Sequence, residues 1–174
     1  SGTVDEFLAS DGWANAQAGD EDAKAAQRIN QQIGVLLQTA TTLTDDGDST
    51  TDVSVILAQS VAKQIATIAA SDSKIDLTSA ATVQQVLTDA AAETVPNQSI
   101  EPASIAAIAN AVAVVNTLAA DVSLDPTSDT AKDISIAMQS TLQTSVEQVV
   151  SGNLTVADFA KNTAPTLLFS DVVV

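Results

Sequence analysis

Apolar residues recur at three- and four-residue steps over most of this chain, and that spacing predicts α-helices. The most regular example covers residues 52–70, where the apolar positions are Val53, Ile56, Leu57, Val61, Ile65 and Ile68. A longer helix is expected over residues 21–44, with an apolar stripe made of Ala26, Ile29, Ile33, Leu36, Leu37, Ala40 and Leu43. We expect this stripe to be buried and the opposite face to stay polar, with Lys24, Gln27, Gln31 and Gln38.

Residues 102–120 carry no charge and predict a helix at the centre of the fold. The larger apolar side chains in this stretch are Ile105, Ile108, Val112, Val115 and Leu118. The alanines between them make the other faces nearly as apolar, which is typical of a helix buried on several sides. About 18 apolar residues can also cross a bilayer. We expect a soluble core helix instead, because the stretch is rich in alanine and is flanked by Glu101 and Asp121, without a nearby lysine or arginine.

Capping residues indicate where these helices begin. Asp20 is expected to cap the helix over 21–44, and Thr78 to cap another helix. The inward-facing residues of that second helix are Val83, Val86, Leu87 and Ala90. Asp125-Pro126 is a further start signal, since proline is favoured in the first turn. The helix that follows it is expected to bury Ala131, Ile134, Met138, Leu142, Val146 and Val149.

Proline and glycine indicate where helices end or approach one another. The helix after Thr78 must end before Pro96, because the residue preceding a proline avoids helical geometry. The helix after Pro126 is expected to stop at Gly152. Gly34 lies inside a helix, where it costs about 1 kcal/mol relative to alanine. We therefore expect a close contact between helices at Gly34.

Short helices are expected at both ends of the chain, and together these elements define the fold class. They cover residues 3–9 and 13–18 near the start, and a last helix capped by Thr155. Residues 165–174 are rich in β-branched side chains and predict an extended linker or the start of a following β-domain. We predict an all-α fold: a single helical bundle of about five long helices plus short terminal helices, formed by residues 3–164.

The charge balance narrows the classes of partner. Six Lys and Arg against 22 Asp and Glu give a formal net charge of −16. Nucleic acid and anionic membrane surfaces are therefore unfavourable partners, and cations are favourable ones. Such a surface is equally consistent with simple solubility or with function in salty or calcium-containing water. The chain has no cysteine, so neither disulfides nor thiolate metal sites stabilise it.

The residue types needed for most catalytic sites are missing. The chain has no histidine, cysteine or tyrosine, which excludes Ser-His-Asp and Cys-His machinery and the usual zinc sites. No glycine-rich phosphate loop occurs among its six glycines. Carboxylate pairs that cleave glycosides need sugar-binding aromatics, and aromatic residues make up only 2% of this chain. We predict that the protein is not an enzyme and has no cofactor, and calcium is the one candidate ion.

The strongest candidate site is an acidic loop between two predicted helices. Asp45, Asp46, Asp48 and Asp52 place carboxylates around Gly47, and flexible acidic loops can supply the oxygen ligands that calcium prefers. The spacing differs from that of an EF-hand. A solvated loop whose last acid caps the next helix explains the same residues without a metal. A second, looser acidic cluster contains Asp121, Asp125 and Asp129.

Several of these motifs occur in the same order in a known type of domain. They are the WANAQAGDEDAKAAQRINQQIGVLLQTAT stretch from Trp13, IDLTSAATVQQVL from Ile75 and LTVADFAKNTA from Leu154. In this order the chain resembles the alanine-rich helical domain of giant bacterial secreted or surface proteins with cadherin-like, VCBS or RTX calcium-binding repeats. The resemblance covers about residues 3–164. Trp13 itself and the acidic loop depart from the common pattern.

This resemblance implies a role outside the cell. Such proteins are adhesin-like, are exported by type I secretion and localise to the extracellular space or the bacterial cell surface. We therefore expect an excised piece of a longer protein, in which this module is a non-catalytic spacer or adhesion-associated domain next to β-domains. The alternative is a ligand-binding helical module that holds calcium or a partner peptide, at its acidic loops or in a bundle groove. In either case we expect a protein or cell-surface ligand, no nucleic acid and no membrane insertion.

Overall fold

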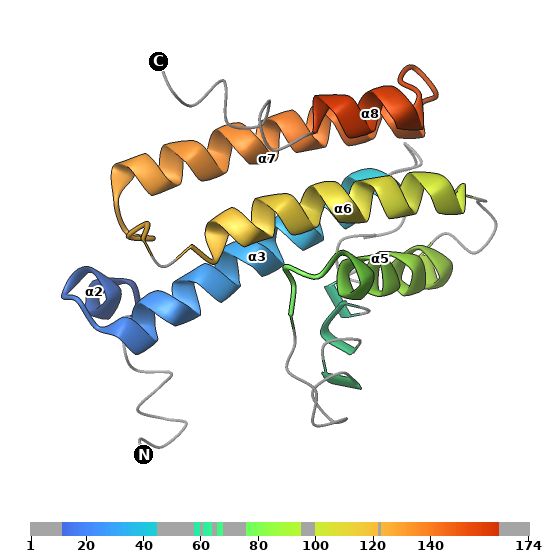
Figure 1. Ribbon diagram of the computed structural model, residues 1–174. Coiled ribbons are helices and arrows are strands. Elements are labelled where there is room, and N and C mark those ends of the chain that lie inside the picture. Colours follow the sequence, from blue (N-terminus) through green and yellow to red (C-terminus); the bar gives the residue numbers. More distant parts are fainter. Residues whose placement is uncertain are drawn as a thin grey trace, which may run out of the picture.

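The protein is a helical bundle in the computed structural model, which describes residues 12–44, 58–59, 61–63, 66–67, 76–94, 100–121 and 123–163 (Figure 1). The helices are α2 (Gly12–Gln17), α3 (Glu21–Thr44), α5 (Ala80–Thr94), α6 (Pro102–Ala119), α7 (Asp129–Val150) and α8 (Val156–Asn162). Every regular element in these described ranges is a helix, which confirms the predicted all-α class. Residues 58–59, 61–63 and 66–67 are helical as well, within the helix predicted over 52–70.

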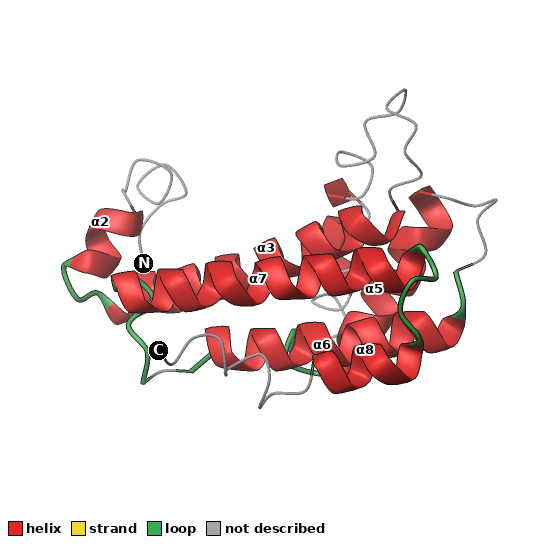
Figure 2. Ribbon diagram, turned by 90° about the horizontal axis from the view of Figure 1, so that it is seen from above, coloured by secondary structure: helices red, strands yellow, loops and turns green. Residues whose placement is uncertain are grey.

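Helix α6 is the centre of the bundle, as its apolar sequence predicted. It packs against α3, α5, α7 and α8, and Figure 2 shows α3, α6 and α7 running alongside one another. Ile105, Ile108, Val112 and Val115 are all buried. Among the described helices, α6 is long and apolar enough to cross a membrane, with a mean hydropathy of 1.6. Its position between other helices accounts for that hydropathy without a bilayer.

Helix α3 has the predicted bounds, and Leu36, Ala40 and Leu43 of its predicted stripe are buried, but its first half buries a different face. The Asp20 carboxylate accepts hydrogen bonds from the backbone N–H groups of Asp22 and Ala23, so Asp20 is the N-cap, as predicted. Ile29, predicted to lie on the buried stripe, is 53% exposed. Arg28 and Gln32 are buried instead. In the first half of α3 the buried face therefore contains polar residues, because α6 and the chain after it offer carbonyl oxygens there.

The close helix contact predicted at Gly34 is wrong. Gly34 is exposed, and a Cβ atom built on it meets no other atom within 4 Å. Nothing in the packing therefore requires glycine at this position.

Helices α5 and α7 begin with the same four-residue turn, which corrects two predicted starts. In Asp76–Ser79 and in Asp125–Ser128, the Asp carboxylate accepts hydrogen bonds from the N–H and the hydroxyl of the Thr two residues on. The Ser N–H donates to the Asp carbonyl oxygen, and the helix begins after the Ser. Thr78 and Pro126 therefore precede their helices, and the second residue of each turn, Leu77 or Pro126, is buried.

The end of α7 and the short helix α8 follow the predicted signals. Gly152 has a positive φ of 73° just after α7, where glycine carries no steric cost. Thr155 caps α8 by accepting from the N–H of Asp158, and its hydroxyl donates to the Asp158 carboxylate. Phe159 is fully buried and attaches α8 to the core.

Some predicted elements lie outside the described residues. They are the short helix over 3–9, most of the helix over 52–70, and the extended segment 165–174. These remain predictions. Lys63, within the helical residues 61–63, forms an ion pair with Glu93 of α5 at 2.7 Å.

Candidate functional site

The predicted calcium ligands Asp45, Asp46, Asp48 and Asp52 lie outside the described residues. The calcium prediction therefore stays a prediction. In the part of the chain that the structure describes, no group of three or more acidic side chains is placed to hold a metal ion.

The carboxylates of the second acidic cluster take part in local contacts rather than meeting at one point. The Asp121 carboxylate accepts from the N–H of Ser123 at 2.8 Å. Asp125 accepts from Thr127 in the turn that precedes α7. Asp129 forms an ion pair with Lys132 at 3.1 Å. Each acid therefore stabilises its own turn or helix start.

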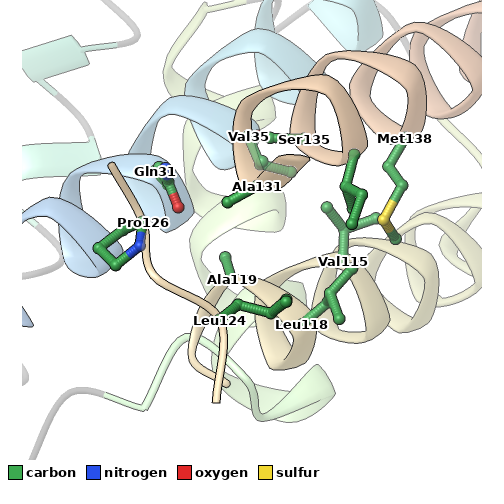
Figure 3. A pocket seen from close by; sticks show the side chains of 11 residues that line it. Gln31, Val35, Val115, Leu118, Ala119, Leu124, Pro126, Ala131, Ser135 and Met138 are labelled. Atoms are coloured by element: carbon green, nitrogen blue, oxygen red, sulfur yellow. The ribbon is translucent and has the colours of Figure 1, made fainter. Parts of the chain in front are cut away.

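An apolar pocket lies beside this cluster, where α3, α6 and α7 meet (Figure 3). Its lining is mostly aliphatic: Val35 from α3, Val115, Leu118 and Ala119 from α6, Leu124 and Pro126 from the connection, and Ala131, Ile134 and Met138 from α7. The only polar side chains in the lining are Gln31 and Ser135. The cavity volume is about 20 Å³, enough for about one water molecule. In this state the pocket is too small for a cofactor.

Residues 123–128, which we call the strap, form one wall of this pocket and are bound to α3 by two cations. Lys24 forms an ion pair with the Asp125 carboxylate at 3.5 Å. The Arg28 guanidinium donates to the Leu124 carbonyl oxygen at 3.3 Å. Lys24 and Arg28 are four residues apart on α3, so they lie on one face of the helix. Two neighbouring residues of the strap are thereby attached to that face.

A buried row of amides continues from Arg28 into the core. Gln32 donates to the Asn116 carbonyl oxygen at 3.1 Å, and the Asn116 side chain donates to the Leu77 carbonyl oxygen at 2.9 Å. Asn116 is fully buried, yet its side-chain oxygen has no hydrogen-bond partner, and neither does Nε of Arg28. These contacts join α3, α6 and the turn before α5. In these contacts the polar groups position the helices and are not presented to solvent.

Hydrogen bonds, with smaller contributions from nearby charges, lower the pKa of Asp125 in the strap and of Asp121 just before it. The Thr127 hydroxyl and N–H, followed by Lys24, lower the pKa of Asp125. Hydrogen bonds from Ser123, and to a smaller extent the charge of Arg28, lower the pKa of Asp121. Glu21 and then Asp125 raise the pKa of Lys24. All these groups are therefore charged at neutral pH, which suits ion pairing rather than proton transfer.

Two larger depressions lie elsewhere on the described surface and lack a pair of acids. One, of about 360 Å³, lies near the start of α6 and of α8 and has Glu101 in its lining. The other, of about 350 Å³, lies between the ends of α3 and α7 and has Glu147 in its lining. Each lining contains a single carboxylate, so neither presents the facing acids that glycoside hydrolysis needs.

The residues with the most informative contacts were not singled out from the sequence. Arg28 and Gln32 are polar residues next to the predicted apolar stripe, so the sequence predicts them at the surface. Asn116 is one of a few polar residues in an apolar helix. The available signal is their spacing: Arg28, Gln32 and Val35 follow at steps of four and three. Such steps show that the three residues share one face of the helix, but they do not show that this face is the buried one.

Comparisons with known proteins give no family for this chain. No family model, no curated protein and no solved structure matches it. The resemblance to the helical domains of giant bacterial surface proteins therefore rests on sequence motifs alone and stays a prediction.

Proposed function

We propose that this chain is a non-catalytic structural module, a spacer or interaction domain of a large extracellular bacterial protein. The observation that carries the proposal is how the polar groups inside the bundle are used. Arg28, Gln32 and Asn116 are buried and bonded to backbone carbonyls of neighbouring segments. They fix the relative positions of helices, which is what a load-transmitting module requires.

The arrangement of the helices supports a spacer. Helix α2 lies at one end of the bundle and α8 at the other in both ribbon views (Figures 1 and 2). Helix α3, with its 24 residues, spans about 36 Å at 1.5 Å per residue. A module of this shape can keep the segments attached to its two ends apart by roughly that length.

A distance measurement between the two ends tests the spacer. Because the chain has no cysteine, Gln17→Cys and Asn162→Cys supply the only two attachment points for spin labels. Both residues are exposed, one on α2 and one on α8. Pulsed electron–electron double resonance should give one narrow distribution of distances between the two spin labels. A broad distribution at conditions where the helices are intact would contradict a rigid spacer, whatever the parent protein is.

The alternative is a ligand-binding module, and an observation favours one form of it. The pocket at α3, α6 and α7 is almost entirely apolar, so a bundle groove that opens to take a partner is consistent with it. Calcium binding by the acidic loop has support from the sequence alone.

A calcium titration separates these possibilities. Calorimetry on the protein and on an Asp46→Asn, Asp48→Asn double variant would detect a site in the acidic loop. The matched control is Asp129→Asn, Asp133→Asn, which removes the same charge from exposed positions of α7. Saturable heat lost only in the first variant would favour the calcium module. Equal weak heats in all three proteins would leave the plain spacer.

A further inference from the structure

We propose that residues 123–128 form an acid-released strap, which closes the apolar pocket at neutral pH and exposes it when the carboxylate of Asp125 is protonated. This is a conformational device of the bundle, and it stands or falls independently of the proposed spacer function.

The strap supplies a wall of the pocket that no helix supplies. Leu124 and Pro126 line the cavity together with Leu118 and Ala119 of α6, and Figure 3 shows Leu124 next to these two α6 residues and Pro126 near Gln31. Pro126 is buried, and Leu124 is half-buried. Movement of the strap away from α3 would therefore open the pocket, without requiring any helix to unfold.

The strap is attached to α3 by an ion pair and a hydrogen bond, while α3, α6 and α7 meet mainly through buried apolar side chains. On the α3 side, Lys24 forms the ion pair and Arg28 donates the hydrogen bond to the strap. By contrast, α3, α6 and α7 meet through buried side chains such as Val35, Val115 and Met138. A change in charge thus weakens the attachment of the strap and leaves the helix packing in place.

The charged groups around Asp125 give the release a definite direction with pH. Lys24 and, through it, Glu21 face Asp125 from α3, while the charge of Arg28 acts on Asp121. On α7, Asp129 and Lys132 pair with each other. The pKa of Asp125 is lowered, so its ionic attachment is complete above the usual range of an Asp carboxyl and is lost as the pH falls through the lowered value. Acid, not base, opens the strap.

The test uses an environment-sensitive apolar dye of the anilinonaphthalene sulfonate type, with the complete chain. Dye fluorescence and far-UV circular dichroism are recorded together from pH 7 down to about pH 2, so that the scan extends well below the usual range of an Asp carboxyl. Wild-type protein should bind dye as the pH falls while its helicity is still that of pH 7. Asp125→Asn keeps the oxygen that accepts from Thr127 but removes the charge, so it should bind roughly two- to fivefold more dye at pH 7 than wild type.

Two further variants make the result decisive. Lys24→Gln removes the same ion pair from the α3 side, leaves the turn of the strap intact and should also raise dye binding at pH 7. Asp129→Asn removes an equal charge next to the strap but not from it, and should bind dye as wild type does. The proposal is overturned if Asp125→Asn and Lys24→Gln bind no more dye than Asp129→Asn, or if dye binding in acid only accompanies loss of helicity.

Discussion

At the residue scale, the buried face in the first half of α3 is decided by hydrogen-bond acceptors rather than by the apolar stripe that the second half buries. Ile29 is exposed, while Arg28 and Gln32 are buried against carbonyl oxygens of Leu124 and Asn116. A buried acceptor that loses its donor costs more free energy than an exposed isoleucine. Apolar periodicity cannot anticipate this choice, because the acceptors belong to segments far away in the sequence.

Replacing Arg28 tests how much this polar face contributes. Arg28→Met keeps most of the side-chain volume but leaves the Leu124 carbonyl without its donor. We expect the free energy of unfolding to fall by about 1–3 kcal/mol in urea titrations. Lys161→Met is the control, since Lys161 forms an exposed ion pair with Asp158 and its loss should change stability by about 0.5 kcal/mol or less. Equal effects of the two substitutions would contradict a structural role for Arg28.

Two of the glycines next to open space, Gly34 and Gly152, should respond in opposite ways to replacement by alanine. Gly34 lies in the middle of α3 with room for a methyl group, so Gly34→Ala should stabilise the protein by about 0.5–1 kcal/mol. Gly152 has the same room but a φ of 73°, so Gly152→Ala should destabilise it by about 1 kcal/mol. Thermal melts of both variants would show the difference. Destabilisation by Gly34→Ala would mean that a helix does approach this position.

At the element scale, helix bounds follow from the sequence more closely than helix faces do. Asp20, Gly152 and Thr155 act as predicted because a cap involves only residues next to it in the chain. The starts of α5 and α7 are displaced from the predicted ones for a local reason too. In each turn the Thr donates its hydrogen bonds to the Asp two residues before it. The Ser that follows the Thr therefore caps the helix.

The cap of α7 can be measured directly. The Ser128 hydroxyl accepts from the N–H of Ala131 at 3.1 Å, so Ser128→Ala should lower the free energy of unfolding by about 1 kcal/mol. Ser128→Asn should retain most of it. Ser79 has the equivalent role for α5 with a longer contact of 3.5 Å to Thr82, so Ser79→Ala should cost less. A larger loss at Ser79 than at Ser128 would rule out this ranking of the two turns.

At the scale of the whole molecule, the sequence predicts the bundle and its central helix, but not a site. The uncharged stretch of α6 predicts burial on several sides, and four helices surround it. The candidate site behaves differently, because the strap and its pocket are made by residues from α3, α6, α7 and the connection between them. Their proximity depends on tertiary packing, which neither spacing nor composition encodes.

The net charge leads to a prediction about the molecule as a whole. With a formal charge of −16, the folded chain repels itself more strongly than an extended one, and salt screens that repulsion. The surface ion pairs weaken in salt, but each contributes little. The melting temperature at pH 7 should therefore rise when sodium chloride is raised from about 10 mM to about 500 mM. At the higher concentration the Debye length is shorter than the spacing of the surface charges, so their repulsion is screened.

Calcium at matched ionic strength shows whether screening explains the acidic composition. If carboxylates only need screening, calcium chloride and sodium chloride of equal ionic strength should raise the melting temperature by similar amounts. If the loop at Asp45, Asp46, Asp48 and Asp52 binds the ion, calcium should add a stabilisation that grows with the logarithm of its concentration. That extra stabilisation should disappear in the Asp46→Asn, Asp48→Asn variant and persist in Asp129→Asn, Asp133→Asn. A melting temperature that falls with sodium chloride would instead mean that the local ion pairs outweigh the general repulsion, and the acidic surface would then need an explanation other than tolerance of salt.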